Sequence, residues 1–90
     1  MRRPLVCGNW KLNGSLDQTA ALVDDIAAGA TGLEGADVAV CPVFVHVPLA
    51  CERAAGSRLA IGAQDVSDRS AGAYTGEVAA AMLRALGVRL

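Results

Sequence analysis

The sequence predicts an α/β protein built on a parallel β-sheet. Short apolar runs alternate with segments that have helical periodicity, in the order βαβαβα followed by the start of a fourth strand. Strands that alternate with helices form parallel sheets with right-handed crossovers. The length of 90 residues suits one small domain, and a hydrophobic content of 53% is enough to build a core.

The first strand is expected over residues 5–7. This apolar run does not alternate with polar residues, which is typical of a strand covered on both faces. Ser15 and Gln18 form a capping box that begins a helix directly after Gly14. The apolar residues of this helix recur at helical spacing and predict a buried stripe: Leu16, Ala20, Val23, Ile26, Ala27 and Ala30.

The second strand is expected over residues 37–41 and stops at Pro42, which cannot donate a hydrogen bond to a neighbouring strand. Pro48 suits the first turn of a second helix that ends near residue 55. A third strand is expected over residues 59–63. The second and third units therefore repeat the organisation of the first.

A loop over residues 67–76 contains few apolar residues, and loops of this length usually have a function or a partner. Thr75 is the expected N-cap of a third helix with Glu77 in its first turn, and Gly87 is its expected end. Residues 88–90 begin what reads as a fourth strand. The chain stops there, which indicates the opening portion of something larger.

The stretch Gly8-Asn9-Trp10-Lys11 lies where the first strand passes into the first helix. Ligands bind at such strand ends in parallel α/β proteins. Asn9 and Lys11 are two positions apart, so an extended backbone would direct both to one side. An amide and an ammonium group there suit an anionic ligand rich in oxygen.

Lys11 is the only lysine among eight basic residues, which favours a role for a compact point charge at this place. A solvated loop lysine is the alternative interpretation.

Composition argues against several classes of function. The net charge of −1 does not favour binding to nucleic acid or to a membrane surface. No apolar stretch approaches the roughly 18 residues of a membrane span. The run over residues 1–7 is too short for the core of a signal peptide, so a cytoplasmic protein is expected.

The cysteines do not have the spacing of a metal or redox motif. Cys7, Cys41 and Cys51 form no CxxC pair, and His46, the only histidine, has no partner at ligand spacing. No metal is expected. Cys7 and Cys41 lie in apolar runs, where a buried thiol acts as a small hydrophobic group.

Four motifs in order resemble the triose-phosphate isomerase family. Residues 8–15 (GNWKLNGS) are similar to its first strand-to-helix motif, and residues 40–44 (VCPVF) to the end of its second strand. Residues 62–66 (GAQDV) and 70–77 (SAGAYTGE) are similar to its third strand and the loop that follows. The resemblance implies a partial (β/α)₈ TIM barrel, with residues 1–90 as the N-terminal part of a single, incomplete domain.

The resemblance also implies an activity. The family interconverts dihydroxyacetone phosphate and glyceraldehyde 3-phosphate, in glycolysis and gluconeogenesis, through an enediolate and without a cofactor. It is a standard example of acid–base chemistry by a Glu base and a neutral His electrophile. Asn9 and Lys11 fall on its substrate-binding positions, with Lys11 in the catalytic, electrostatic role and Asn9 donating a hydrogen bond and holding Lys11 in place.

Both residues that transfer protons in the family are expected beyond Leu90, so the isolated chain is expected to be inactive. His46 follows the wrong strand to be the electrophile. None of Glu34, Glu52 and Glu77 is a candidate for the base, because each lies in a turn, on a helix surface or at a helix start.

The loop over residues 67–77 resembles the segment that dimers of this family insert into the neighbouring subunit. The resemblance places the dimer interface at Tyr74, Thr75, Gly76 and Glu77. A mobile surface loop is the alternative interpretation. A second interpretation of the whole chain is also open: a truncated or engineered barrel fragment that only self-associates, through the open strand edge at residues 88–90, and binds phosphate weakly.

Overall fold

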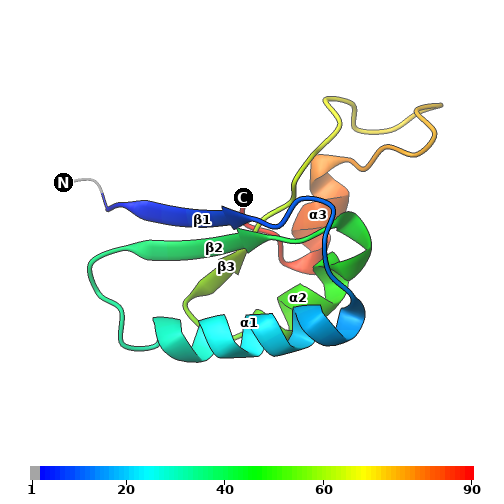
Figure 1. The fold of residues 1–90 in the computed structure, drawn as a ribbon. Coiled ribbons are helices and arrows are strands. Elements are labelled where there is room, and N and C mark those ends of the chain that lie inside the picture. The colour runs from blue at the N-terminus through cyan, green and yellow to red at the C-terminus, as the bar shows by residue number, and fades with distance from the viewer. Residues whose placement is uncertain (1–2) are drawn as a thin grey trace.

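A computed structural model describes residues 3–90 and shows a three-stranded parallel sheet in the order β1-β2-β3. The first two residues, part of the N-terminal run considered above, lie outside the described range. The strands are β1 (Leu5–Asn9), β2 (Asp37–Cys41) and β3 (Leu59–Ile61). Helices α1 (Leu16–Ala30) and α2 (Val47–Ala54) lie together below the sheet, and α3 (Ala80–Leu86) follows a long loop (Figure 1). The α/β prediction with parallel strands is confirmed.

The two helices cover the sheet with a small aliphatic core. Pro48 lies in the first turn of α2, as predicted, and a short 3₁₀ helix (Phe44–His46) leads into it. The core is formed by residues from α1, α2, β2 and β3: Val23, Val40, Val47, Ala50, Ala54, Leu59 and Ile61. None of the helices over residues 3–90 has the length and apolar character needed to cross a bilayer.

The Ser15 half of the predicted capping box is confirmed, because the Ser15 hydroxyl accepts a hydrogen bond from the Gln18 backbone N–H at 3.2 Å. The reciprocal hydrogen bond from the Gln18 side chain to Ser15 is not found within residues 3–90. The predicted buried stripe of α1 is confirmed at Val23 and Ala30, which are buried. The prediction was wrong for Leu16, whose exposed fraction is 55%. Thr19 is buried in its place. Its hydroxyl lies 3.3 Å from Nδ1 of His46, and this contact links α1 to the segment before α2.

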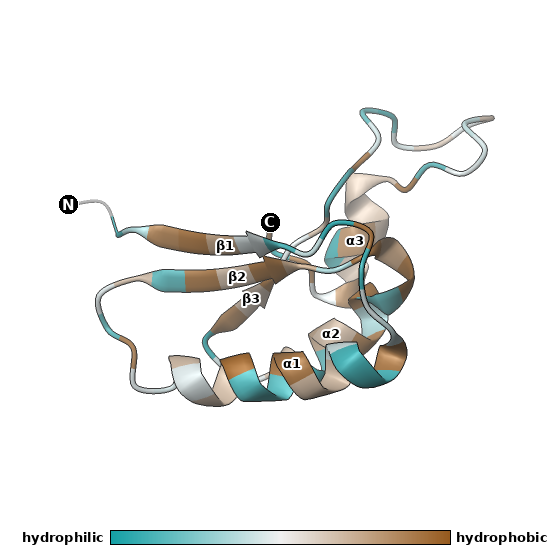
Figure 2. Cartoon of the chain, in the orientation of Figure 1, coloured by the Kyte–Doolittle hydropathy of each residue, from teal (hydrophilic) through white to brown (hydrophobic). Residues whose placement is uncertain are grey.

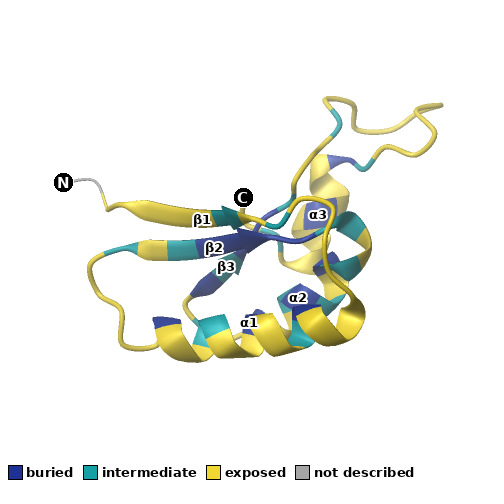
Figure 3. Cartoon of the chain, viewed as in Figure 1, coloured by how far each residue is buried: buried dark blue, intermediate teal, exposed yellow. Residues whose placement is uncertain are grey.

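Strand β1 differs from the prediction. It was expected to be covered on both faces, yet Leu5 is 52% and Val6 61% exposed, and Cys7 is exposed as well. β1 pairs only with β2 among the described residues, so it forms an edge of the sheet. Figures 2 and 3 show the result, a strand that is hydrophobic in sequence and exposed along most of its length.

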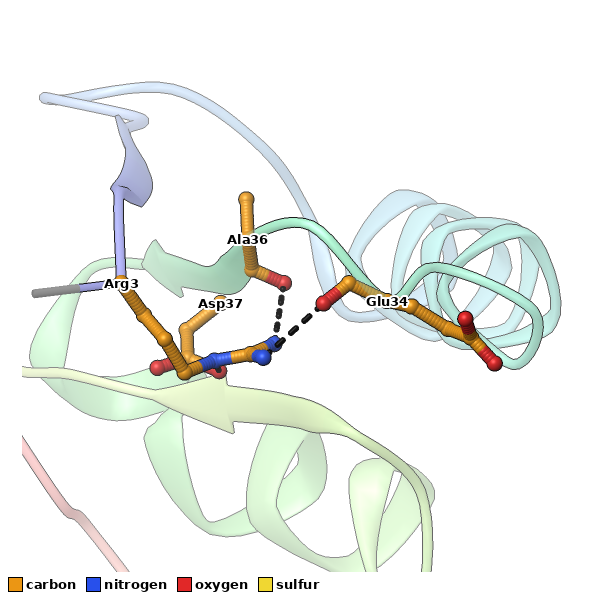
Figure 4. Close-up of polar contacts among 4 residues, drawn as sticks. All are labelled: Arg3, Glu34, Ala36 and Asp37. Carbon is orange, nitrogen blue, oxygen red and sulfur yellow. Dashed lines mark hydrogen bonds and ion pairs between the residues drawn. The ribbon is translucent and has the colours of Figure 1, made fainter. Parts of the chain in front are cut away.

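The side chain of Arg3 holds the beginning of β1 against the turn before β2 (Figure 4). Its Nε donates to the Asp37 carboxylate at 3.1 Å, and its two terminal nitrogens donate to the backbone oxygens of Glu34 and Ala36 at 2.9 and 3.2 Å. Arg3 and Asp37 are both about half exposed, so the ion pair itself adds little stability. The planar guanidinium instead fixes which residues of the two segments lie side by side.

The third helix begins later than predicted. α3 starts at Ala80, and Thr75 lies in a turn without capping it. The Ser67 N–H donates to the Val78 oxygen at 2.9 Å, and Ala79, which pairs with Ser67, has an extended backbone. The end of the helix is as predicted, because Gly87 has a φ of +103°, which favours glycine.

Residues 88–90 are not assigned as a strand, but their backbone lies along β3. The Arg89 N–H donates to the Ile61 oxygen at 2.9 Å, and the Ala63 N–H donates to the Leu90 oxygen at 3.0 Å. The backbone thus makes hydrogen bonds at the position where a fourth parallel strand was predicted.

Candidate active site

The segment after β1 makes an unusual turn at Lys11. Its φ is +56°, and it is the only non-glycine residue with a positive φ in the range 3–90. This left-handed conformation costs an L-residue roughly 1–2 kcal/mol. Such residues cluster at functional sites, where surrounding contacts hold them in place. The expectation of an extended backbone through Lys11 was wrong, because the chain turns here.

Two side-chain amides hold this turn from within. Oδ1 of Asn9 accepts a hydrogen bond from the Lys11 backbone N–H at 2.9 Å, and Nδ2 of Asn13 donates to the Trp10 oxygen at 2.9 Å. Asn9 therefore holds Lys11 in place by accepting a hydrogen bond through Oδ1. Nδ2 of Asn9 has no hydrogen-bond partner within residues 3–90, so this donor is available to a ligand.

A third amide fastens the turn to the rest of the sheet. Nε2 of Gln64, just after β3, donates to the backbone oxygens of Lys11 and Cys41, both at 2.8 Å. The Trp10 N–H donates to the same Cys41 oxygen at 3.1 Å. The carboxyl ends of β1, β2 and β3 are thus joined by hydrogen bonds around Lys11.

Sequence analysis included Gln64 only as part of the motif at residues 62–66 and missed this role. The available signal was its position, because a neutral amide at a strand end can donate to neighbouring carbonyl groups. The sequence contains nothing that identifies which carbonyl groups these are.

Changing Gln64 to Glu in the complete polypeptide is expected to loosen the turn. A carboxylate cannot donate to the Lys11 and Cys41 oxygens, so we expect a loss of about 1–3 kcal/mol of unfolding free energy. Hydrogen exchange at the Lys11 amide should also become faster. Gln18→Glu is the matched control, because a carboxylate in the first turn of α1 interacts favourably with the helix dipole. Equal exchange rates at Lys11 in both variants would contradict this role of Gln64.

The charge of Lys11 is not neutralised within the described chain. Its side chain is exposed, and none of the ion pairs among residues 3–90 includes it. The groups that hold its backbone are neutral amides. The site therefore offers a positive charge and a free amide donor to an anion, with no carboxylate paired to Lys11.

The expected dimer residues lie elsewhere in the fold. Tyr74, Thr75, Gly76 and Glu77 are all exposed on the loop that projects away from the sheet (Figure 1). The guanidinium of Arg69 lies over the Tyr74 ring, 5.2 Å from its centre. The structure does not bring these residues together with the Lys11 turn by any hydrogen bond or ion pair in the described part of the chain.

His46 has a structural explanation. Its ring nitrogen lies beside the buried Thr19 hydroxyl and links α1 to the segment before α2. Within residues 3–90, no three His, Cys, Asp or Glu side chains are arranged to hold a metal ion.

The sequence model of the family described as triosephosphate isomerase matches residues 4–90. The chain belongs to the triosephosphate isomerase family. This confirms the resemblance seen in the four sequence motifs.

Individual members of the family are similar to this chain over nearly its whole length. The triosephosphate isomerase of Methylococcus capsulatus is 49% identical over 90 residues, covering 100% of this chain and 36% of the relative. That of Dechloromonas aromatica is 51% identical over 89 residues, covering 99% and 35%. The crystal structure of the Bartonella henselae enzyme matches with a TM-score of 0.88 and 29% identity, covering 97% of this chain and 35% of that one.

The chain thus spans about a third of the length of these family members. The match to a solved member of the family also confirms the predicted fold class, a partial TIM barrel that comprises its N-terminal units.

Proposed function

We propose that residues 1–90 form the N-terminal part of a single barrel domain in a triose-phosphate isomerase. The complete polypeptide would interconvert dihydroxyacetone phosphate and glyceraldehyde 3-phosphate as a cytoplasmic enzyme of glycolysis and gluconeogenesis, without a cofactor. Support comes from family membership and from one observation above all. The single lysine of the chain is held in a strained conformation at a strand end, with its charge unpaired within residues 3–90.

In this proposal Lys11 binds the substrate and stabilises charge. Its ammonium group would interact with the phosphate and with the enediolate oxygen as negative charge develops there. Asn9 would contribute its free Nδ2 donor. Because the backbone of the turn is already fixed by the Asn9 and Gln64 hydrogen bonds, little reorganisation is needed when the charge appears.

The proton transfers need residues from outside this chain. His46 already contacts Thr19, and Glu34, in the turn between α1 and β2, is exposed. General acid–base catalysis contributes about 10²–10⁴-fold to such a reaction. A chain without the acid and base is expected to lose this factor as well as the remaining phosphate contacts.

The test is an isomerase assay of two samples, the complete polypeptide and the 90-residue chain. We expect turnover by the complete polypeptide and a background rate from the 90-residue chain. Comparable turnover by both would place the acid and base within residues 1–90 and would contradict the proposal. Absence of isomerase activity from the complete polypeptide would also contradict it.

We also propose that the complete protein is a homodimer held by the loop of residues 67–77, with Tyr74, Thr75, Gly76 and Glu77 at the interface. The exposure of these residues and the projection of their loop support this assembly. The triose phosphate would be its small-molecule partner, with no nucleic acid and no membrane involved.

A second candidate function, a self-associating module that binds phosphate weakly, is favoured by the exposed apolar edge at β1. Unpaired strand edges promote association. Concentration-dependent oligomers of the 90-residue chain, together with an inactive complete polypeptide, would favour this alternative.

A further inference from the structure

Gly62, directly after β3, lies where neighbouring segments of the sheet approach most closely. Its N–H donates to the Val40 oxygen on β2 at 2.9 Å. A Cβ atom added at Gly62 would lie 2.7 Å from Sγ of Cys41 and 3.1 Å from Cβ of Leu90. We propose that Gly62 is a positioning residue for Lys11, because the space left by its missing side chain fixes the strand that anchors the Lys11 turn.

The requirement for glycine at this position comes from space and not from backbone conformation. Gly62 is not among the glycines of residues 3–90 that have a positive φ, so an alanine could adopt the same backbone. Its methyl group, however, would come closer to the Cys41 sulfur than Cβ atoms come to other atoms in proteins. The added methyl group or its neighbours must therefore move.

The atoms around this position have little freedom to move away. Cys41 is 9% exposed, and its Sγ already lies 3.6 Å from Sγ of Cys7. The backbone oxygen of Leu90 would lie 3.3 Å from the added Cβ atom, and it accepts a hydrogen bond from the Ala63 N–H at 3.0 Å. Both neighbours of β3, which are β2 and residues 88–90, belong to the described structure. Inserting a methyl group between such neighbours shifts the backbone.

A shift of Cys41 reaches the Lys11 turn through one carbonyl group. The Cys41 oxygen accepts from the Trp10 N–H at 3.1 Å and from Nε2 of Gln64 at 2.8 Å. The same Nε2 donates to the Lys11 oxygen at 2.8 Å. When the Cys41 backbone moves, the groups that hold the turn therefore move with it. The effect on activity rests on the proposed function, whereas the displacement of the turn does not.

The test compares Gly62→Ala with Gly35→Ala in the complete polypeptide. Gly35, in the turn before β2, is the matched control because a Cβ atom there would meet nothing within 4 Å. We expect Gly62→Ala to lower kcat about 10- to 100-fold, as a misplacement of about 1 Å can produce. Hydrogen exchange at the Trp10 amide should become faster, and Gly35→Ala should change neither quantity. kcat is measured per folded molecule well below the melting temperature, where a purely structural role would leave it unchanged.

A second substitution tests the route through Cys41. Cys41→Ala removes the sulfur atom that the new methyl group would meet, whereas the close contact with Leu90 remains. The kcat of the double variant should therefore lie between the values for Gly62→Ala and Cys41→Ala. If Gly62→Ala does not fold, the double variant is compared with Cys41→Ala, and equal kcat values would overturn the proposal.

The other outcomes separate the parts of the proposal. A lower melting temperature with an unchanged kcat for Gly62→Ala would reduce Gly62 to a packing residue and refute its positioning role. A double variant as slow as Gly62→Ala would contradict the route through Cys41. If the wild-type polypeptide is inactive and Gly62→Ala still speeds exchange at the Trp10 amide, the proposed function fails and the link between Gly62 and the turn stands.

Discussion

Replacing Lys11 by Ala in the complete polypeptide is expected to lower kcat/KM by at least about 10²–10³-fold, the effect of removing one preorganised electrostatic group from a transition state. Lys11 is the only charged side chain in the turn that Asn9, Asn13 and Gln64 hold in place. Without it, the phosphate and the enediolate oxygen would face only neutral donors there. Steady-state kinetics with either triose phosphate measures the change.

Stability should separate this effect from unfolding. Ala pays the same conformational cost as Lys at a φ of +56°, so the melting temperature of Lys11→Ala should be nearly unchanged. Lys11→Gly should gain up to about 1 kcal/mol of stability and still lose activity, because relief of a strain of roughly 1–2 kcal/mol exceeds the entropic cost of glycine, about 0.5–1 kcal/mol. Arg84→Ala, at an exposed cation on α3, is the control for loss of charge. Near-normal turnover by Lys11→Ala would contradict the assigned role.

Shortening the loop by removing residues 68–73 is expected to convert the proposed dimer to monomers. The deletion removes Arg69, which lies over the Tyr74 ring, and most of the projecting segment. The ends of the loop remain close, because the Ser67 N–H donates to the Val78 oxygen, so the remaining residues can span the gap. Interface energy is concentrated in a few large side chains, and we expect the dimer Kd to rise at least about 10²-fold.

Sedimentation velocity over a range of concentrations measures this Kd. Tyr74→Ala should weaken the dimer in the same direction and by less, since it removes one aromatic anchor. Leu33→Ala, at a 40% exposed apolar residue in the turn after α1, is the matched control and should leave the Kd unchanged. An intact dimer of unchanged affinity after the deletion would assign the interface to another surface.

Features set by neighbouring residues were predictable from sequence. The Ser15 N-cap of α1 and the glycine at the end of α3 act within one or two turns of chain, and both appear in the structure as expected. Features set by distant contacts were not. The N-cap expected at Thr75 is displaced by the backbone contact between Ser67 and Val78, which no local propensity reveals.

In the candidate site, too, local features were predictable from sequence and features set by distant contacts were not. Asn9 and Lys11 could be selected because residues at the end of a parallel strand have a known tendency to bind ligands. The left-handed backbone of Lys11 could not be predicted from sequence. Its carbonyl oxygen is held by the side chain of Gln64, which lies 53 residues further along the chain. The exposure of Cys7 was missed for a related reason. Its apolar neighbours indicate a strand, but they do not indicate that the strand lies at an edge.

The long sequence separation between Lys11 and Gln64 also sets an order of events during synthesis. At about 5–20 residues per second, a ribosome adds Gln64 about 3–10 s after Lys11. The capping box of α1 can form as soon as its own residues are available. The Lys11 turn, in contrast, lacks the Gln64 hydrogen bond until the end of β3 has been made. The turn near the N-terminus therefore takes its final shape only after the helix that follows it.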